Sequence, residues 1–233
     1  MSDNNGGVEV ELQEEAIAKM KAHDYEGAAK LFNDIIESRP KDPIGYINFG
    51  NLLLHMEDYE RAERFFQKAI ELSPHVATAY YGLGNMYFEQ SIYPKAQENF
   101  EKAMKLGLEE ADVYYMLGMT FYKQEHFKLA LPYLLRATEL NPDDSEIMFQ
   151  YGLTLAQSDH IVDAKTIFEH VLKLDDSHSD AYYNLGVIAL YNDHPKESLN
   201  NFEMALKIQP EHMLAANGKK EAEKRLRASD ETK

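Results

Sequence analysis

The stretch TAYYGLGNMYFEQ, residues 78–90, decides the fold because it allows two incompatible interpretations. Its two glycines could belong to a phosphate-binding turn, whereas its large residues could form one face of a helix. Tyr80, Leu83 and Tyr87 recur at i, i+3 and i+7, which is helical spacing. A G-x-G-x-x-G turn would need a third glycine where Tyr87 stands, and no predicted strand precedes the stretch. We therefore interpret these residues as part of a helix.

One glycine of this stretch belongs to a series that recurs every 34 residues. The series consists of Gly50, Gly84, Gly118, Gly152 and Gly186. Further series with the same step are mostly alanine, phenylalanine, tyrosine or leucine, and apolar positions after residue 93 again have helical spacing. Each unit is therefore predicted to be two helices joined by a short turn. Because glycine inside a helix costs roughly 1 kcal/mol relative to alanine, we expect a close contact there, with Gly84 facing Ala96.

This pattern resembles the tetratricopeptide repeat family, whose 34-residue motif is a helix–turn–helix. The matching residues in the third unit are Tyr80, Leu83, Gly84, Tyr87, Ala96, Phe100 and Ala103. The resemblance implies an all-α fold, a superhelical α-solenoid of six repeats with a C-terminal capping helix. The predicted repeats are 9–42, 43–76, 77–110, 111–144, 145–178 and 179–212. We further predict a capping helix over 213–228 and disordered tails over 1–8 and 229–233.

Composition excludes several classes of function. The 233 residues include 24 basic and 40 acidic side chains, and the resulting net charge of −16 opposes binding to nucleic acids and to anionic membranes. The chain has no cysteine, which excludes disulfides, cysteine-ligated zinc and thiol catalysis. No apolar run approaches the length of a membrane span, and residues 1–15 lack the features of a secretory signal. We therefore expect a cytoplasmic protein.

The resemblance also implies a binding surface, because in this family the first helices of the repeats line a concave groove. The groove positions in repeats two to six carry four acidic side chains and one basic side chain. The candidate protein-binding residues are Asn48, Asn51, Tyr81, Asn85, Phe88, Tyr115, Met119, Tyr122, Phe149, Gln150, Tyr183, Asn184 and Tyr191.

Four of these candidates form a series with the 34-residue step, which we call the aromatic ladder: Tyr81, Tyr115, Phe149 and Tyr183. Exposed rings could anchor the apolar side chains of a partner, and the neighbouring amides could bind the backbone of an extended peptide. The alternative is that the rings shield the seams between repeats, as similar residues do throughout the family. The sequence leaves both interpretations open.

A third 34-residue series consists of histidines in the turns: His126, His160 and His194. Metal ligands must converge to within about 2.1 Å of one ion, whereas equivalent points on successive packed helices are roughly 10 Å apart. We therefore interpret these histidines as solvated turn residues and expect no metal or cofactor. The sequence contains no recognisable catalytic motif, so no catalytic residue is predicted.

These observations favour a non-enzymatic scaffold or adaptor that binds a peptide or helix of a partner protein in the groove. The acidic charge predicts a neutral or basic partner segment with apolar anchors. Alternatives are weak self-association through the cationic helix near Lys220, an RNA-associated helical repeat, which the charge opposes, and an enzyme or small-molecule binder, which the lack of a catalytic set opposes.

Overall fold

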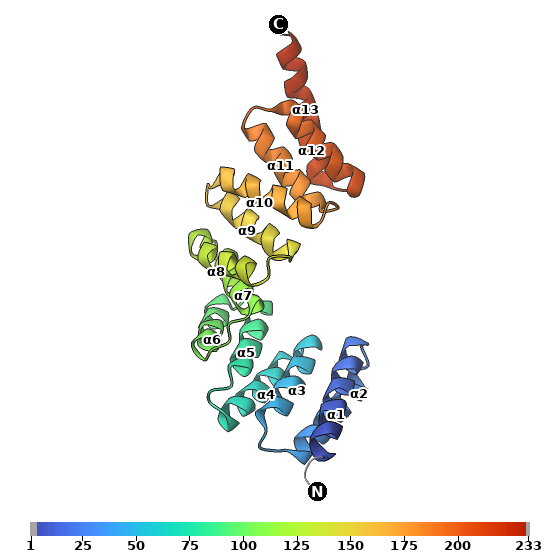
Figure 1. Cartoon of the computed structure of the whole chain (residues 1–233), viewed down its shortest axis with the longest axis vertical. Coiled ribbons are helices and arrows are strands. Elements are labelled where there is room, and N and C mark those ends of the chain that lie inside the picture. The colour runs from blue at the N-terminus through green and yellow to red at the C-terminus, as the bar shows by residue number, and fades with distance from the viewer. Residues whose placement is uncertain (1–3, 232–233) are drawn as a thin grey trace. The chain divides into compact units, whose positions relative to one another are not determined.

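The computed structural model describes residues 4–231, over which the chain forms thirteen α-helices and no strand. All of them are connected by short turns (Figure 1). The helices are α1 (Asn4–Lys21), α2 (Tyr25–Ser38), α3 (Pro43–His55), α4 (Tyr59–Leu72), α5 (Ala77–Glu89), α6 (Tyr93–Lys105), α7 (Ala111–Lys123), α8 (Phe127–Leu140), α9 (Ser145–Gln157), α10 (Ile161–Leu174), α11 (Ser179–Tyr191), α12 (Pro195–Ile208) and α13 (Met213–Glu231).

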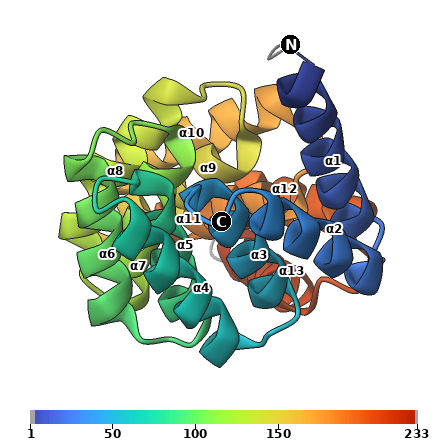
Figure 2. The ribbon, with the colours of Figure 1, turned by 90° about the horizontal axis from the view of Figure 1, so that it is seen from below.

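The helices divide between two compact units, one ending at Glu109 and the other beginning at Glu110. The N-terminal unit contains α1 to α6, and the C-terminal unit contains α7 to α13. Within each unit every odd-numbered helix packs against the even-numbered helix that follows it, and each pair packs against the next (Figures 1 and 2). We call the odd-numbered helices α1 to α11 the first helices and the even-numbered helices the second helices. The predicted all-α helical repeat is confirmed.

The turn inside each helix pair has the same backbone conformation, which explains why the pairs share one geometry. The second of its three residues adopts a positive φ in all six pairs, although none of the six is glycine. In the third pair this residue is Ser91, with φ 60°. Its N–H donates to the carbonyl of Phe88, and the N–H of Ile92 donates to the carbonyl of Tyr87. These two bonds form a Schellman motif, which ends the first helix and directs the chain into the second.

The periodic glycines mark the closest approach of the two helices in a pair. A Cβ atom added to Gly84 would lie 2.5 Å from Cε1 of Phe100, and one added to Gly118 would lie 2.7 Å from Cγ of Leu134. The predicted close contact at Gly84 is confirmed, but the atoms nearest to the added Cβ belong to Phe100 and not to Ala96. The residue that excludes a side chain is the large apolar one sixteen positions on, because its ring or branched end lies flat against the glycine backbone.

Two rings of the phenylalanine series, Phe66 and Phe202, also lie against a glycine of the helix that follows their pair. A Cβ atom added to Gly82 would lie 2.4 Å from the ring of Phe66, and the same ring approaches Gly50 of its own pair. Phe202 repeats the arrangement at the end of the chain, where it lies against Gly186 and against Gly218 of α13. At these two positions a ring between two glycines joins a helix pair to the helix that follows, and α13 is held in the same way as α5.

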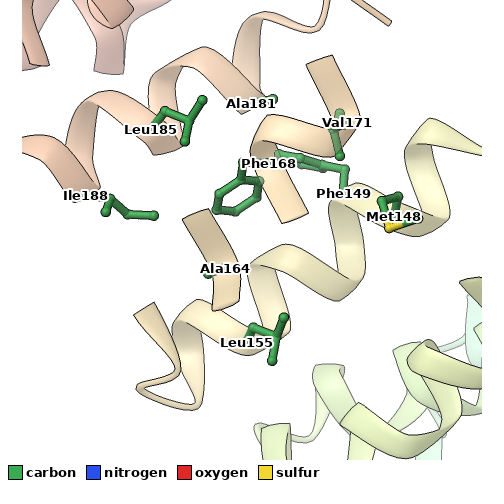
Figure 3. Packing of buried hydrophobic residues seen from close by; sticks show 9 residues of the cluster. All are labelled: Met148, Phe149, Leu155, Ala164, Phe168, Val171, Ala181, Leu185 and Ile188. Atoms are coloured by element: carbon green, nitrogen blue, oxygen red, sulfur yellow. The ribbon is translucent and has the colours of Figure 1, made fainter. Parts of the chain in front are cut away.

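A representative part of the core lies around Phe168 in the C-terminal unit. Its ring is fully buried between residues of α9 and α11, with Phe149 beside it and Leu185 and Ile188 on the α11 side (Figure 3). Ala164 and Ala181 are also fully buried in this cluster and allow the helices to approach closely. The small residues of the 34-residue series therefore leave the space that its large residues fill in the core.

The first and last helices extend beyond the boundaries that the sequence predicts. Helix α1 begins at Asn4, within the range 1–8 predicted as a tail, and residues 1–3 lie outside the described part. Helix α13 continues to Glu231 rather than ending at 228, and residues 232–233 also lie outside the described part. Extending an existing helix needs no new nucleation, which lets these polar ends continue a helix already fixed by packing.

Candidate functional site

The predicted groove residues of the N-terminal unit lie on α3 and α5, and all five are half-buried: Asn48, Asn51, Tyr81, Asn85 and Phe88. Two amides therefore come from one helix and one amide from the next first helix. The Oδ1 atom of Asn85 is buried and has no hydrogen-bond partner. A buried acceptor of this kind typically costs about 1–3 kcal/mol until a donor reaches it.

The predicted groove residues of the C-terminal unit differ widely in exposure. Tyr191 is 76% exposed, whereas Met119 and Phe149 are 9% and 6% exposed. The remaining members are half-buried: Tyr115, Tyr122, Gln150, Tyr183 and Asn184. The structure therefore places Met119 and Phe149 in the core, and neither offers a surface to a partner.

Three rings of the aromatic ladder pack inside their own helix pairs. The rings of Tyr81 and Phe100 have centroids 5.8 Å apart, those of Phe149 and Phe168 are 5.6 Å apart, and those of Tyr183 and Phe202 are 5.9 Å apart. Such tilted pairs at these separations are favourable aromatic contacts. The prediction that Phe149 is an exposed anchor is wrong, because its ring packs against Phe168 and against His178, whose ring centroid lies 4.4 Å away.

The groove tyrosines of α7 are held in their protonated form. Burial, followed by the nearby carboxylates of Glu146 and Asp144, raises the pKa of Tyr115 to about 12. Burial also raises the pKa of Tyr122 above its ordinary value. Both hydroxyl groups therefore carry a proton at neutral pH and can donate a hydrogen bond to a ligand.

The amides of this unit donate to their own helices. Nε2 of Gln150 donates to Oε1 of Glu146 at 2.8 Å, and Nδ2 of Asn184 donates to the carbonyl of Asp180 at 2.8 Å. These bonds use amide N–H groups and orient the side chains along the helix. The amide oxygens are then the groups best placed to accept hydrogen bonds from a ligand.

Two histidines that sequence reasoning missed cap the N-termini of α11 and α13. Nδ1 of His178 accepts a hydrogen bond from the N–H of Ala181, and Nδ1 of His212 accepts one from the N–H of Ala215. Since Nδ1 of His212 is an acceptor, the ring proton lies on Nε2, which donates to Oδ1 of Asp180 at 3.0 Å. The signal was present in the sequence, because the same last position carries the capping residues Asp42 in the first repeat and Asp144 in the fourth.

We expect His212→Ala to lower the free energy of unfolding by about 2 kcal/mol, because it removes a helix cap and the ring that packs on Tyr183. His212→Asn should cost about 1 kcal/mol less, because asparagine can cap the helix. Urea denaturation of the two variants measures this difference. Equal losses in the two variants would show that the cap contributes nothing.

The three turn histidines behave as the spacing predicts. His126, His160 and His194 each precede a second helix, are exposed, and make no side-chain capping bond to it. Among the side chains that the structure describes, residues 11–228, no three histidines or carboxylates lie close enough together to hold a metal ion.

The sequence of these repeated helix pairs is similar to that of known proteins. Two models of the tetratricopeptide repeat match the chain, one over residues 42–109 and 76–143 and the other over residues 179–212. The chain belongs to the tetratricopeptide repeat family. No curated protein sequence matches the chain.

Among solved structures, the chain is similar to YrrB, described as a TPR protein with an unusual peptide-binding site. The identity is 46%, the TM-score is 0.75, and the match covers 83% of this chain and all of that one. The chain is also similar to pilF of Pseudomonas aeruginosa, with 13% identity, a TM-score of 0.80 and coverage of 93% and 98%. A third neighbour is PilW, a type IV pilus biogenesis factor, with 17% identity, a TM-score of 0.76 and coverage of 90% and 97%.

These similarities differ in weight. At 13% and 17% identity, the two pilus-related structures show a shared fold and nothing about shared partners. The similarity to YrrB extends to the sequence over most of this chain. None of the helices described between residues 4 and 231 combines the length and the apolar character that crossing a membrane requires.

Proposed function

We propose that this protein is a non-enzymatic scaffold that binds a peptide or helix of a partner protein along the face formed by its first helices. The observation that carries the proposal is an exposed apolar stripe on α11. Val187 is 40% exposed and Tyr191 is 76% exposed, one turn apart on the same face as Asn184. Large side chains left in water beside an amide are typical of interaction surfaces rather than of packing.

The charge of the same face supports a choice of partner. Asp112, Glu146 and Asp180 occupy the same position in the first turn of α7, α9 and α11, and all three are exposed. A partner segment with apolar anchors and neutral or basic neighbours complements this arrangement. The peptide-binding site in the name of YrrB supports a peptide as ligand, since that chain is 46% identical.

A second candidate is self-association through the two ends of the chain. Lys220, Lys224 and Arg227 are exposed on α13, and Glu11, Glu14 and Glu15 are exposed on α1. Opposite charges on the two terminal helices favour contact between copies, with a strength that falls as salt rises. Light scattering over a range of protein concentrations distinguishes this candidate, because only self-association makes the mass increase with concentration.

The proposal predicts that an α11 double variant, Val187→Ala with Tyr191→Ala, loses most of its affinity for a groove ligand. The ligand is a peptide selected from a random displayed library on the whole chain. An anchor of this kind typically contributes about 2 kcal/mol, or roughly thirtyfold in affinity. Isothermal titration of the selected peptide against wild type and the double variant measures the loss.

The matched control is Val162→Ala, because Val162 is 81% exposed but lies on the second helix α10. This control should bind the peptide as wild type does. If the double variant melts cooperatively near wild type and still binds with unchanged affinity, the face of the first helices is not the binding surface.

A further inference from the structure

Helix α13 packs beside α11, in the way that one first helix packs beside the next. Two hydrogen bonds show how the two helices run. Next to their starts, Nε2 of His212 donates to Oδ1 of Asp180 at 3.0 Å. Further along, Nη1 of Arg225 donates to the carbonyl of Leu190 in the last turn of α11 at 3.0 Å. The two helices therefore run in the same direction, and Arg225 lies beside the end of α11, where Tyr191 is exposed.

The part of α13 that lies beside the end of α11 is cationic, although the chain is acidic. Residues 219–227 include five basic and two acidic side chains, whereas the whole chain has 24 and 40. Lys224 is exposed and forms no ion pair with any side chain described between residues 11 and 228. A terminal helix of a repeat protein needs a polar outer surface, which charges of either sign provide. Solubility therefore does not explain the local excess of positive charge.

Arg225 is the repeat equivalent of Tyr191, one repeat further along the chain. Its Nε atom donates to Oε1 of Glu221 at 3.1 Å, and its Nη1 atom donates to the carbonyl of Leu190. These two bonds hold the guanidinium beside α11. They leave both N–H groups of Nη2 without a partner in the described part of the chain, so the side chain can donate to a ligand from a fixed position.

The charge of this surface changes sign between the start and the end of α11. Asp180 lies in the first turn, Lys224 and Arg225 lie beside the last turn, and the exposed side chains of Val187 and Tyr191 lie between them. Neighbouring packed helices are roughly 10 Å apart, and an extended segment covers that distance in about three residues. A segment anchored on the α11 side chains therefore places a residue about three positions away against the two cations, where a carboxylate complements the charge.

A second copy of this chain could also supply carboxylates to α13. Each copy has a net charge of −16, so two whole copies repel each other as they approach. A short segment with a few carboxylates reaches the cations without this repulsion. Charge therefore favours a segment of a partner protein over a second copy.

We propose that the partner segment carries an aspartate or glutamate about three residues from its apolar anchor, and that this carboxylate binds Lys224 and Arg225. The inference rests on the proposed function, because it concerns the same bound segment. It extends the binding surface from α11 to α13, and it adds one acidic position to a segment that is otherwise neutral or basic.

The experiment selects peptides from a random displayed library on the full chain and, in parallel, on the Lys224→Glu variant. We expect the wild-type peptides to share an aspartate or glutamate near their apolar residues, and the variant peptides to lack it. A wild-type peptide and its counterpart with asparagine or glutamine at the acidic position are then titrated by calorimetry into wild type and Lys224→Gln. The replacement should weaken binding about fivefold in wild type and less than about twofold in the variant.

The matched control is Lys207→Gln, which removes an exposed lysine of the second helix α12 and should behave as wild type. A cooperative melt near that of wild type establishes that each variant is folded. Selected peptides without a shared carboxylate, or an equal loss of affinity in wild type and Lys224→Gln, overturn the proposal. A Lys224→Glu variant that no longer gains mass with concentration, as wild type does, but binds the wild-type peptide unchanged also overturns it, because the cations then serve contact between copies.

This inference and the proposed function fail in different ways. If the selected peptides depend on Val187 and Tyr191 but not on a carboxylate, only the inference is overturned. If no selected peptide depends on Val187 and Tyr191, both are overturned.

Discussion

Replacing Gly118 with leucine should lower the free energy of unfolding of the C-terminal unit by about 3 kcal/mol, because the new side chain has no room. Even a Cβ atom at this position would lie 2.7 Å from Cγ of Leu134 and 3.3 Å from the backbone nitrogen of Leu134. Because the backbone of Leu134 is also close, room for the new side chain arises only if the second helix α8 shifts away from α7. Urea denaturation followed by circular dichroism measures the loss.

Two controls separate crowding from a general effect of substitution. Lys123→Leu introduces the same side chain at an exposed position of the same helix and should change stability by less than about 0.5 kcal/mol. Gly118→Ala should destabilise wild type, whereas in a Leu134→Ala background it should stabilise by up to about 1 kcal/mol, because alanine is the better helix former. If Gly118→Ala has the same effect in both backgrounds, the contact with Leu134 does not explain the glycine.

The second large effect is expected at Phe149. Phe149→Ala should cost about 3–5 kcal/mol of stability, because it removes a ring that is 6% exposed and packed between Phe168 and His178. Tyr191→Ala, which removes an aromatic ring that is 76% exposed, should cost less than about 0.5 kcal/mol. Thermal or urea melts of the two variants give the comparison directly.

This pair of variants tests the division of the candidate residues into core and surface. A small loss of stability in Phe149→Ala would show that the ring is accessible and would return it to the set of candidate anchors. A large loss in Tyr191→Ala would show that the α11 stripe is part of the packing, which would remove the main support for the proposed binding surface.

The fold could be predicted from the sequence because the contacts between helices recur every 34 residues, as the residue pattern does. Five glycines and a matching series of large apolar residues occupy equivalent positions, so one pair of helices defines all the others. The partner of each glycine could not be predicted. Both Ala96 and Phe100 lie on the facing side of the second helix, and only the crossing of the two helices brings the ring of Phe100 to Gly84.

The candidate site was predicted less well than the fold. Tyr183 and Phe149 occupy the same position in their repeats, yet Tyr183 is half-buried and Phe149 belongs to the core. Exposure at this position depends on what the neighbouring residues cover, and the series itself carries no information about that. The caps made by His178 and His212 were missed because histidine is an uncommon capping residue, although its Nδ1 atom can accept from a backbone N–H.

The most direct test of the proposed scaffold function is a map of where a bound peptide touches the chain. A peptide selected from a random library is made with a photo-reactive residue at each position in turn, cross-linked to the full chain, and the attachment sites are identified by mass spectrometry. We predict attachment on the first helices, with α11 residues Asn184, Val187 and Tyr191 among the sites, and loss of these products in the Val187→Ala and Tyr191→Ala double variant. Attachment concentrated on the second helices α8, α10 and α12 would contradict the account.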